Sequence, residues 1–389
     1  MRKKTLLAVL LCTFLLVGCG DANEADGPVV IQGEELETSG AESSSEVADA
    51  EEEKEPELQV ITEREIVDGK MQSYLTGEWK DADVVQRRSM AVMMPNNEGA
   101  LPQKGISYAS IIYEAPVEGR ITRLMAIIED YDELEYVGPV RSSRDYYVYE
   151  SMAYDSIYCN WGLAVPYVAD LINSDRVDNV SQAVSGIESS APYAFERLDR
   201  PGYKKEYRGY MTIDGYEKAV DKKGYETQYR DTFEQAFTFA DEGCRATYDE
   251  YPDATKIWPG GEEKNRGGYG SAYPCFTYDE EEGVYYRTQY GETHVDEIGN
   301  TPLTVSNVVF KICHGEVRDS HDYLAFGVHG TGDAYVFTNG KVIKGTWSRP
   351  SDYEANKFFD EDGNEIIFNQ GKTWICNIWL EYQEFMKWE

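Results

Sequence analysis

Short apolar runs that end in turn-forming residues recur along this chain, and they restrict it to folds built on a sheet. One run, Met90 to Met94, is closed by Pro95-Asn96-Asn97-Glu98-Gly99, which predicts a buried strand followed by a turn. Two more strands are predicted at residues 110–115 and 122–128, where Gly119 allows a tight connection. A fourth is predicted at residues 156–161.

Helical spacing lies between these strands. Ser142 can cap a helix, with Asp145 at the three-residue offset of a capping box and Tyr146 and Tyr149 following at helical spacing. A second helix is predicted at residues 165–172. Strands that alternate with helices favour a sheet covered by helices, so residues 61–228 are predicted to form a mixed α/β domain.

The pattern changes after a polar and aromatic junction at residues 214–243, which holds one predicted helix at residues 216–223. Short strand-like runs punctuated by Gly, Asn and Asp then dominate, and Thr338-Asn339-Gly340 is typical of a hairpin turn. Residues 229–389 are therefore predicted to form a mostly antiparallel, β-rich domain. The fold class expected for the chain is α+β, with two domains because its length exceeds one typical core.

The first nineteen residues predict where the protein is located. Arg2, Lys3 and Lys4 precede an apolar run, residues 5–17, that is too short for a permanent membrane span. The run ends in Leu16-Val17-Gly18-Cys19, the pattern of a bacterial lipoprotein signal peptide. Cleavage before Cys19 would leave its thiol to carry a lipid. We expect a protein anchored to the outer face of the bacterial cell membrane, with the membrane as a partner through that lipid.

The next stretch, residues 20–60, is predicted to be a disordered acidic spacer. Its first 38 residues contain fourteen acidic side chains and a single lysine, Lys54, with almost no large apolar residues. The whole chain has a formal charge of −34. Such a charge argues against nucleic acid as a partner, since nucleic-acid binding needs a basic face.

The cysteines do not indicate a metal site. After removal of the leader, and apart from Cys19, five remain, which are widely spaced and odd in number: Cys159, Cys244, Cys275, Cys313 and Cys376. Their disulfide connectivity stays open. Gly371-Lys372-Thr373 lacks the first glycine of a phosphate loop, because that position is Ile366. We therefore predict no metal and no cofactor.

Several longer motifs are spread over nearly everything after the spacer. They are Met90-Ala91-Val92-Met93, Tyr113-Glu114-Ala115-Pro116-Val117-Glu118-Gly119-Arg120-Ile121-Thr122-Arg123, Val137-Gly138-Pro139-Val140-Arg141-Ser142-Ser143-Arg144, His294-Val295-Asp296, Asn307-Val308-Val309, Gly345-Thr346-Trp347 and Gly371-Lys372-Thr373-Trp374-Ile375. In these motifs the chain resembles the YerB-like lipoproteins, a bacterial family of two domains and unknown function. The resemblance implies a fold and a location, and it assigns no catalytic residue.

Four arginines suggest a binding site in this acidic chain. Arg141 and Arg144 flank the predicted helix start, and Arg120 and Arg123 precede it closely enough to converge there. A helix N-terminus favours anions, and a guanidinium group matches a phosphate or a carboxylate. Hydroxyl donors from Thr122, Ser142 and Ser143 complete the predicted site. The ligand would be an anionic molecule of the cell envelope.

Three other interpretations stay open. Glu114, Glu118 and Asp145 are close enough in sequence to tie the arginines into a purely structural network of ion pairs. An envelope hydrolase or transferase acting on a cell-wall polymer could use Glu114 or Glu118 with His294 or Asp296 across a cleft between the domains. The chain could also be a protein–protein scaffold. The C-terminal aromatic residues Trp374, Trp379, Phe385 and Trp388 favour packing and docking over a glycan platform.

Overall fold

The computed structural model describes residues 58–182, 190–265 and 267–389. The predicted signal peptide at residues 1–19, the lipid site Cys19 and nearly all of the predicted spacer lie outside these residues. Among the residues that the structure describes, no helix combines the length and the apolar character that crossing a membrane requires.

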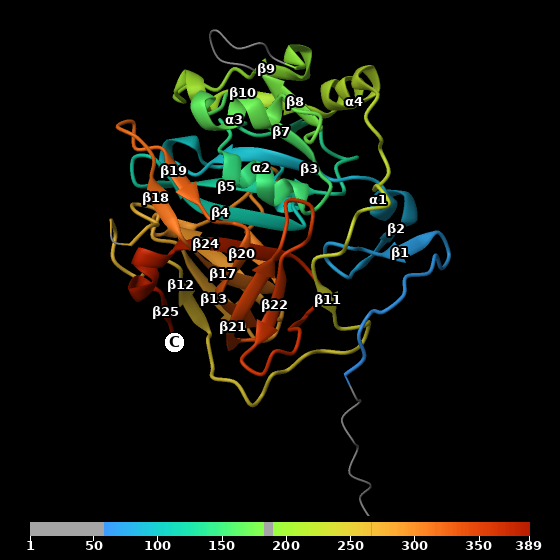
Figure 1. Ribbon diagram of the computed structural model, residues 1–389, viewed down its shortest axis with the longest axis vertical. Helices are drawn as coiled ribbons and strands as arrows, with labels where there is room; N and C mark the ends of the chain where they lie inside the picture. Colours follow the sequence, from blue (N-terminus) through green and yellow to red (C-terminus); the bar gives the residue numbers. More distant parts are fainter. Residues whose placement is uncertain (1–57, 183–189, 266) are drawn as a thin grey trace, which may run out of the picture. The chain divides into compact units, whose positions relative to one another are not determined.

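A ten-stranded mixed sheet is the centre of the fold (Figure 1). In spatial order its strands are β22 (Lys357–Asp360), β21 (Lys341–Arg349), β20 (Gly330–Thr338), β17 (Asn307–Cys313), β24 (Thr373–Trp379), β4 (Ile111–Val117), β5 (Ile121–Ile128), β3 (Met90–Pro95), β7 (Ile157–Trp161) and β8 (Asn179–Gln182). Strand β24 pairs in parallel with both β17 and β4. Segments from both halves of the chain therefore share one sheet, and the boundary between residues 61–228 and 229–389 stays a prediction.

The central strands are apolar along their whole length because both faces of the sheet are covered. Every residue of β3, β4, β17 and the first six of β24 is buried. Along β3, Met90, Val92 and Met94 pack into one apolar core, whereas Ala91 and Met93 pack into another. This alternation is the two-residue period of a strand, and a sheet covered on both faces has near-continuous apolar strands.

Helices cover both faces. Residues of α2 (Asp145–Met152) and α3 (Val165–Ile172) belong to the core on the Ala91 side, and those of α4 (Ile213–Lys223) to the core on the Met90 side. Helix α4 begins where the Thr212 side chain accepts a hydrogen bond from the Gly215 amide, and it ends at Gly224 in the left-handed conformation. The predicted helices at residues 165–172 and 216–223 are thus present.

The start of α2 differs from the prediction. Ser142 is not its N-cap; the N-cap is Arg144, without a capping side chain, and Asp145 is the first helical residue. Residues 141–143 are instead bonded to other segments, and Ser143 forms an isolated β-bridge with Leu163. The Arg141 amide donates to the Met93 carbonyl at 2.8 Å, and the Ser143 amide donates to the Gly162 carbonyl at 2.9 Å. These two hydrogen bonds tie residues 141 and 143 to β3 and to the segment after β7, so the helix begins only at Asp145.

The second half is mostly strand, which with the mixed first half confirms the α+β class. The Asn339-Gly340 turn joins β20 to β21, with Thr338 opposite Lys341 and positive φ at both turn residues, as the sequence predicts. A six-stranded sheet packs nearby. It contains β15 (Glu292–Thr293), β14 (Val284–Gln289), β13 (Cys275–Asp279), β12 (Lys256–Trp258) and β25 (Lys387–Trp388), with β16 (Thr304–Val305) paired to β14.

Shorter elements complete the described chain. The remaining strands are β1 (Lys70–Gln72) with β2 (Trp79–Asp81), β6 (Tyr136–Val137) with β10 (Gly209–Thr212) and β9 (Phe195–Arg197), β11 (Thr238–Phe239) with β23 (Ile367–Phe368), and β18 (Gly315–Val317) with β19 (Leu324–Phe326). The remaining helices are α1 (Ala82–Gln86) and the 3₁₀ turns η1 (Glu98–Ala100), η2 (Ile106–Tyr108), η3 (Pro192–Ala194), η4 (Lys205–Tyr207) and η5 (Leu380–Phe385).

Candidate functional site

Three of the four predicted arginines converge where β5 meets the start of α2. We call Arg123, Arg141 and Arg144 the arginine cluster. The Arg123 guanidinium donates to the Ser142 carbonyl at 2.8 Å. Arg144 donates through Nε to a Glu118 carboxylate oxygen at 2.7 Å and through Nη1 to the Ser143 carbonyl at 2.7 Å. Among the described residues, Arg144 is therefore the one arginine of the cluster that pairs with a carboxylate, that of Glu118.

The charges in the arginine cluster are unevenly compensated. Burial first, and then the neighbouring charges of Arg144 and Arg141, together lower the pKa of Arg123 to about 10. Burial also lowers the pKa of Arg141, against the opposite pull of Glu206. Burial opposes the charge of Arg144 as well, but its hydrogen bond to Glu118 raises its pKa above the ordinary value. Arg123 is thus a positive charge held away from water beside two others.

A fourth cation, which sequence reasoning missed, lies at the edge of the arginine cluster. The exposed Arg197 of β9 stacks over the Trp161 ring at 4.5 Å, and its charge contributes to the lowered pKa of Arg141. Arg141 in turn lies 5.7 Å from the centre of the Tyr207 ring. An arginine in a short edge strand far from the others carries no local signal. Only the pairing of β9 with β10, which in turn pairs with β6, places it here.

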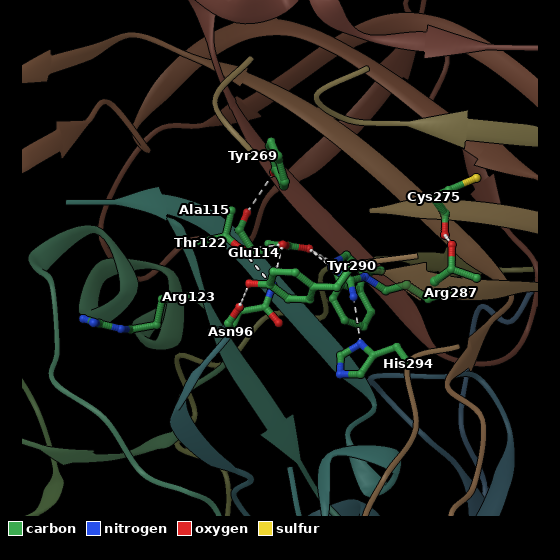
Figure 2. A network of polar contacts seen from close by, with 12 residues as sticks. Asn96, Glu114, Ala115, Thr122, Arg123, Tyr269, Cys275, Arg287, Tyr290 and His294 are labelled. Carbon is green, nitrogen blue, oxygen red and sulfur yellow. Dashed lines mark hydrogen bonds and ion pairs between the residues drawn. The ribbon is translucent and has the colours of Figure 1, made fainter. Parts of the chain in front are cut away.

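The other predicted binding residues are separated from the arginine cluster. Arg120 is exposed in the turn between β4 and β5. Thr122 donates its hydroxyl to Glu114 at 2.7 Å and faces away from Arg123, since neighbours on a strand point to opposite sides (Figure 2). The Ser143 hydroxyl shares a 2.7 Å hydrogen bond with Tyr158. Ser142 contributes its carbonyl oxygen. The structure therefore does not bring Arg120 or the Thr122 hydroxyl into the arginine cluster, and the roles of both residues in ligand binding stay predictions.

Glu114 is the centre of a separate, buried polar network (Figure 2). Its Oε1 accepts from the Asn96 amide at 3.0 Å and from Thr122, and its Oε2 accepts from Arg287 at 2.8 Å and the Trp374 indole at 3.1 Å. The Glu114 side chain is fully buried. All donors that reach it are fixed, so this carboxylate is satisfied as a structural acceptor.

His294 joins the same network through Arg287. Its Nδ1 lies 2.7 Å from Arg287 Nη1, and its Nε2 lies 2.8 Å from the Gln103 side-chain oxygen. Arginine can only donate, so Nδ1 is the acceptor and Nε2 carries the proton. Burial, with Arg287 adding to it, lowers the pKa of His294 well below its ordinary value. The imidazole is therefore neutral, and both of its nitrogens are occupied.

Asp296 has a structural role as an acceptor for backbone amides. Its carboxylate accepts from the backbone amides of Gly105 at 3.1 Å, Ser107 at 2.7 Å and Ile298 at 2.7 Å, and it is fully buried. With Glu118 paired to Arg144, each of the four candidate catalytic residues (Glu114, Glu118, His294, Asp296) holds a fixed protein partner. The geometry consequently favours structural roles for all four over acid–base chemistry.

A cavity of about 400 Å³ lies on the other side of Glu118. We call it the aromatic cavity, because Trp379 of β24 and Tyr382 and Phe385 of η5 line it together with Arg120 and Asp322. The structure thus brings Glu118 and Arg120 to the aromatic cavity, and Arg123, Arg141 and Arg144 to a neighbouring site. Trp374, by contrast, is fully buried in the core, as its predicted packing role requires.

The five cysteines within the described residues are all free thiols. Cys159, Cys313 and Cys376 are buried in the sheet, where burial raises the pKa of each thiol. Thiols kept protonated in this way are poor nucleophiles.

Comparisons with known proteins agree with the motifs. The family described as "Protein of unknown function (DUF3048)" matches through its N-terminal domain at residues 75–226 and through its C-terminal domain at residues 267–375. A relative from Bacillus subtilis (strain 168), "Putative lipoprotein YerB", is 28% identical over 311 residues, which are 79% of this chain and 86% of the relative.

A solved structure is similar as well. The crystal structure of the YerB protein from Bacillus subtilis has a TM-score of 0.64 and 25% sequence identity to this chain, of which it covers 80%, while 98% of that structure is covered. Glu114 lies in the first matched region, and Arg287 and His294 lie in the second. The buried network thus links the two regions that match the family to one another.

Proposed function

This chain belongs to the YerB-like family of lipoproteins of unknown function, and from that premise we propose that it binds an anionic ligand of the cell envelope through the arginine cluster. The protein would be held at the outer face of the cell membrane by a lipid on Cys19. The acidic spacer would separate the binding domains from the bilayer.

The burial of Arg123 without a carboxylate partner is the observation that carries this proposal. The residue is 5% exposed, and within the described residues its guanidinium donates one hydrogen bond, to the Ser142 backbone carbonyl. Among the described residues, neither Arg123 nor Arg141 forms an ion pair, whereas the equally buried Arg88 pairs with Asp155 and Asp178. A buried charge without a partner costs free energy. A bound anion would offset that cost.

The chemistry of the arginine cluster favours a phosphate or a carboxylate. A guanidinium offers two parallel N–H donors to either group, and three guanidinium groups with Glu118 leave a local excess of positive charge. The Nε of Arg141 is buried without a hydrogen-bond partner in the part of the chain described. That donor is available to a ligand oxygen.

The proposal is tested with pyrophosphate as the probe and calorimetry on the full-length chain. Arg141→Gln should keep the fold, because within the described residues the Arg141 side chain makes one hydrogen bond, of 3.4 Å to the Glu206 carbonyl. We expect this change to weaken pyrophosphate binding about tenfold or more, since a charge-assisted hydrogen bond contributes roughly 1.5–3 kcal/mol. Arg87→Gln is the control, because Arg87 is paired with Asp132 outside the cluster. Equal pyrophosphate affinity in the wild type and Arg141→Gln would refute the proposal.

A further inference from the structure

The aromatic cavity is the second feature that invites a ligand, and it does not depend on the anion site. Its volume of about 400 Å³ falls within the roughly 300–1,000 Å³ typical of small-ligand sites. Its walls come from β4 and its turn, from β18 and β19, from Asn265, Gly267 and Gly268, and from the end of β24 and η5. Both regions that match the family therefore contribute to one cavity.

The apolar part of the cavity is held in place by packing. Trp379 meets the Tyr382 ring edge-to-face at 5.3 Å, and its other neighbour, Phe326, lies 6.0 Å away. Glycine at position 315 leaves space for the indole, because a Cβ there would come within 2.8 Å of the ring. Val317 at the rim is 53% exposed. The two half-buried rings have fixed orientations nearly perpendicular to each other, and each can offer an apolar ring surface to a ligand that enters.

The polar part of the cavity is available to a ligand. Arg120, Asn265 and Asp322 are exposed and line the cavity. Within the described ranges none of their side chains forms a hydrogen bond or an ion pair. Arginine only donates, aspartate only accepts, and asparagine does both. The three side chains thus offer both kinds of hydrogen-bonding group above the aromatic surface.

The charges of the described side chains that line the cavity balance. Glu118 is neutralised by Arg144, and the positive Arg120 is matched by the negative Asp322. A neutral ligand fits this balance better than an ion does. A pyranose ring has an apolar C–H face that stacks on an aromatic ring and hydroxyl groups around its edge that donate and accept.

We propose that the aromatic cavity binds a neutral saccharide of one or two pyranose rings, stacked on Trp379 and Tyr382 and hydrogen-bonded by Arg120, Asn265 and Asp322. In an envelope protein such a ring would belong to a glycan strand.

Two soluble trisaccharides, chitotriose and maltotriose, test this proposal by calorimetry on the full-length chain. Each is added up to roughly 10 mM, so that weak binding is detected as well, since a Kd of about 1 mM corresponds to a binding free energy of about −4 kcal/mol. We expect at least one of them to bind. Asp322→Ala should weaken that binding about tenfold. Gly268→Val should abolish it, because a Cβ at position 268 already lies 3.2 Å from Tyr382 and 3.3 Å from Pro116.

Controls separate this site from others. Asp362→Ala removes an equally exposed turn aspartate outside the cavity and should leave saccharide affinity unchanged. Arg141→Gln should also leave it unchanged, so that failure of the anion proposal and failure of this one are distinguishable. The inference is overturned if neither trisaccharide binds, if binding survives both cavity variants, or if Arg141→Gln alone removes it.

Discussion

Arg287 on β14 donates a hydrogen bond to Glu114 on β4 across 2.8 Å, and neither side chain is more than 1% exposed. The two residues are 173 positions apart in the chain. Their ion pair fixes the smaller β14 sheet against the central sheet.

Breaking this pair should destabilise the protein strongly. Arg287→Met leaves the Glu114 carboxylate buried without its cation, and we expect a loss of about 3–5 kcal/mol in the free energy of unfolding. Adding Glu114→Gln should restore part of that loss, because the unpaired charge is then gone. Urea unfolding measures both variants. Lys344→Met is the control, since Lys344 pairs with Glu361 at an exposed site and should change stability by less than about 1 kcal/mol. Equal losses in the single and double variants would contradict the argument.

His294 should make stability fall as the pH drops below neutral. Its folded pKa is depressed by burial and Arg287, whereas the unfolded value is about 6.5. The contribution of His294 to the free energy of unfolding is therefore complete above pH ~6.5. It is lost at lower pH, because the unfolded chain then binds a proton at this histidine and the folded chain does not. Between pH 7 and 5 this loss amounts to about 2 kcal/mol.

The measurement for His294 is urea unfolding across that pH range in the wild type and in His294→Gln. The variant should lack this part of the pH dependence, whatever its absolute stability. His321→Gln changes a histidine whose side chain is 78% exposed and should keep the wild-type slope. A slope in His294→Gln equal to that of the wild type would rule out this role for His294.

A second buried ion pair should control stability in acid. Lys311 Nζ lies 2.9 Å from the Glu150 carboxylate, and both side chains are fully buried. Burial alone would raise the pKa of Glu150, but the charges of Lys311 and Arg349 lower it below its ordinary value. The stability that this group provides is present above its unfolded pKa of about 4.3 and is lost as the pH falls through the depressed folded value.

Lys311→Met removes the nearest cation, so the pKa of Glu150 should rise and acid unfolding should begin at a higher pH. Near-ultraviolet circular dichroism along a pH titration follows that midpoint. Lys357→Met, in a partly exposed pair with Glu365, is the matched change and should leave the midpoint nearly unmoved. An unchanged midpoint in Lys311→Met would show that Glu150 does not depend on Lys311.

Replacing Arg123 should stabilise the protein when no anion is bound. Its pKa is lowered to about 10, so at every pH below that value the folded state carries a charge that the unfolded chain holds more easily. The difference corresponds to roughly 3 kcal/mol, from which the lost hydrogen bond to Ser142 subtracts about 1 kcal/mol. Arg123→Met should therefore gain about 1–2 kcal/mol in urea unfolding. Arg88→Met, which removes a buried but fully paired arginine, should lose stability instead. A loss in both variants would count against an uncompensated charge at Arg123.

Local patterns in the sequence predict much of this fold. The apolar run at β3, the helical spacing of α3 and the Asn339-Gly340 turn depend on residues close together in the chain, and each is present in the structure. The proximity of Arg123, Arg141 and Arg144 is local as well, because β5 and the start of α2 are near in sequence.

The rest depends on pairings between distant segments, which no local period encodes. Nothing near Lys311 indicates that it meets Glu150 of α2 in the core, since a lysine within a strand normally faces solvent. The placement of Arg197 beside Arg141 requires β9 to pair with β10. The cap expected at Ser142 fails for the same reason, because contacts with β3 and the chain after β7 override the local preference for a helix.

The position of β24 has a consequence for how the molecule is made. This strand, residues 373–379, lies between β17 and β4, so one edge of β4 stays unpaired until those residues have been synthesised. Synthesis proceeds from the N-terminus. The N-terminal half therefore cannot complete its sheet before β24 has been synthesised. Until then the unpaired edge of β4 can form hydrogen bonds with incorrect segments or with other chains. A chain interrupted shortly before β24 would leave unpaired the two strand edges, one of β4 and one of β17, that β24 covers.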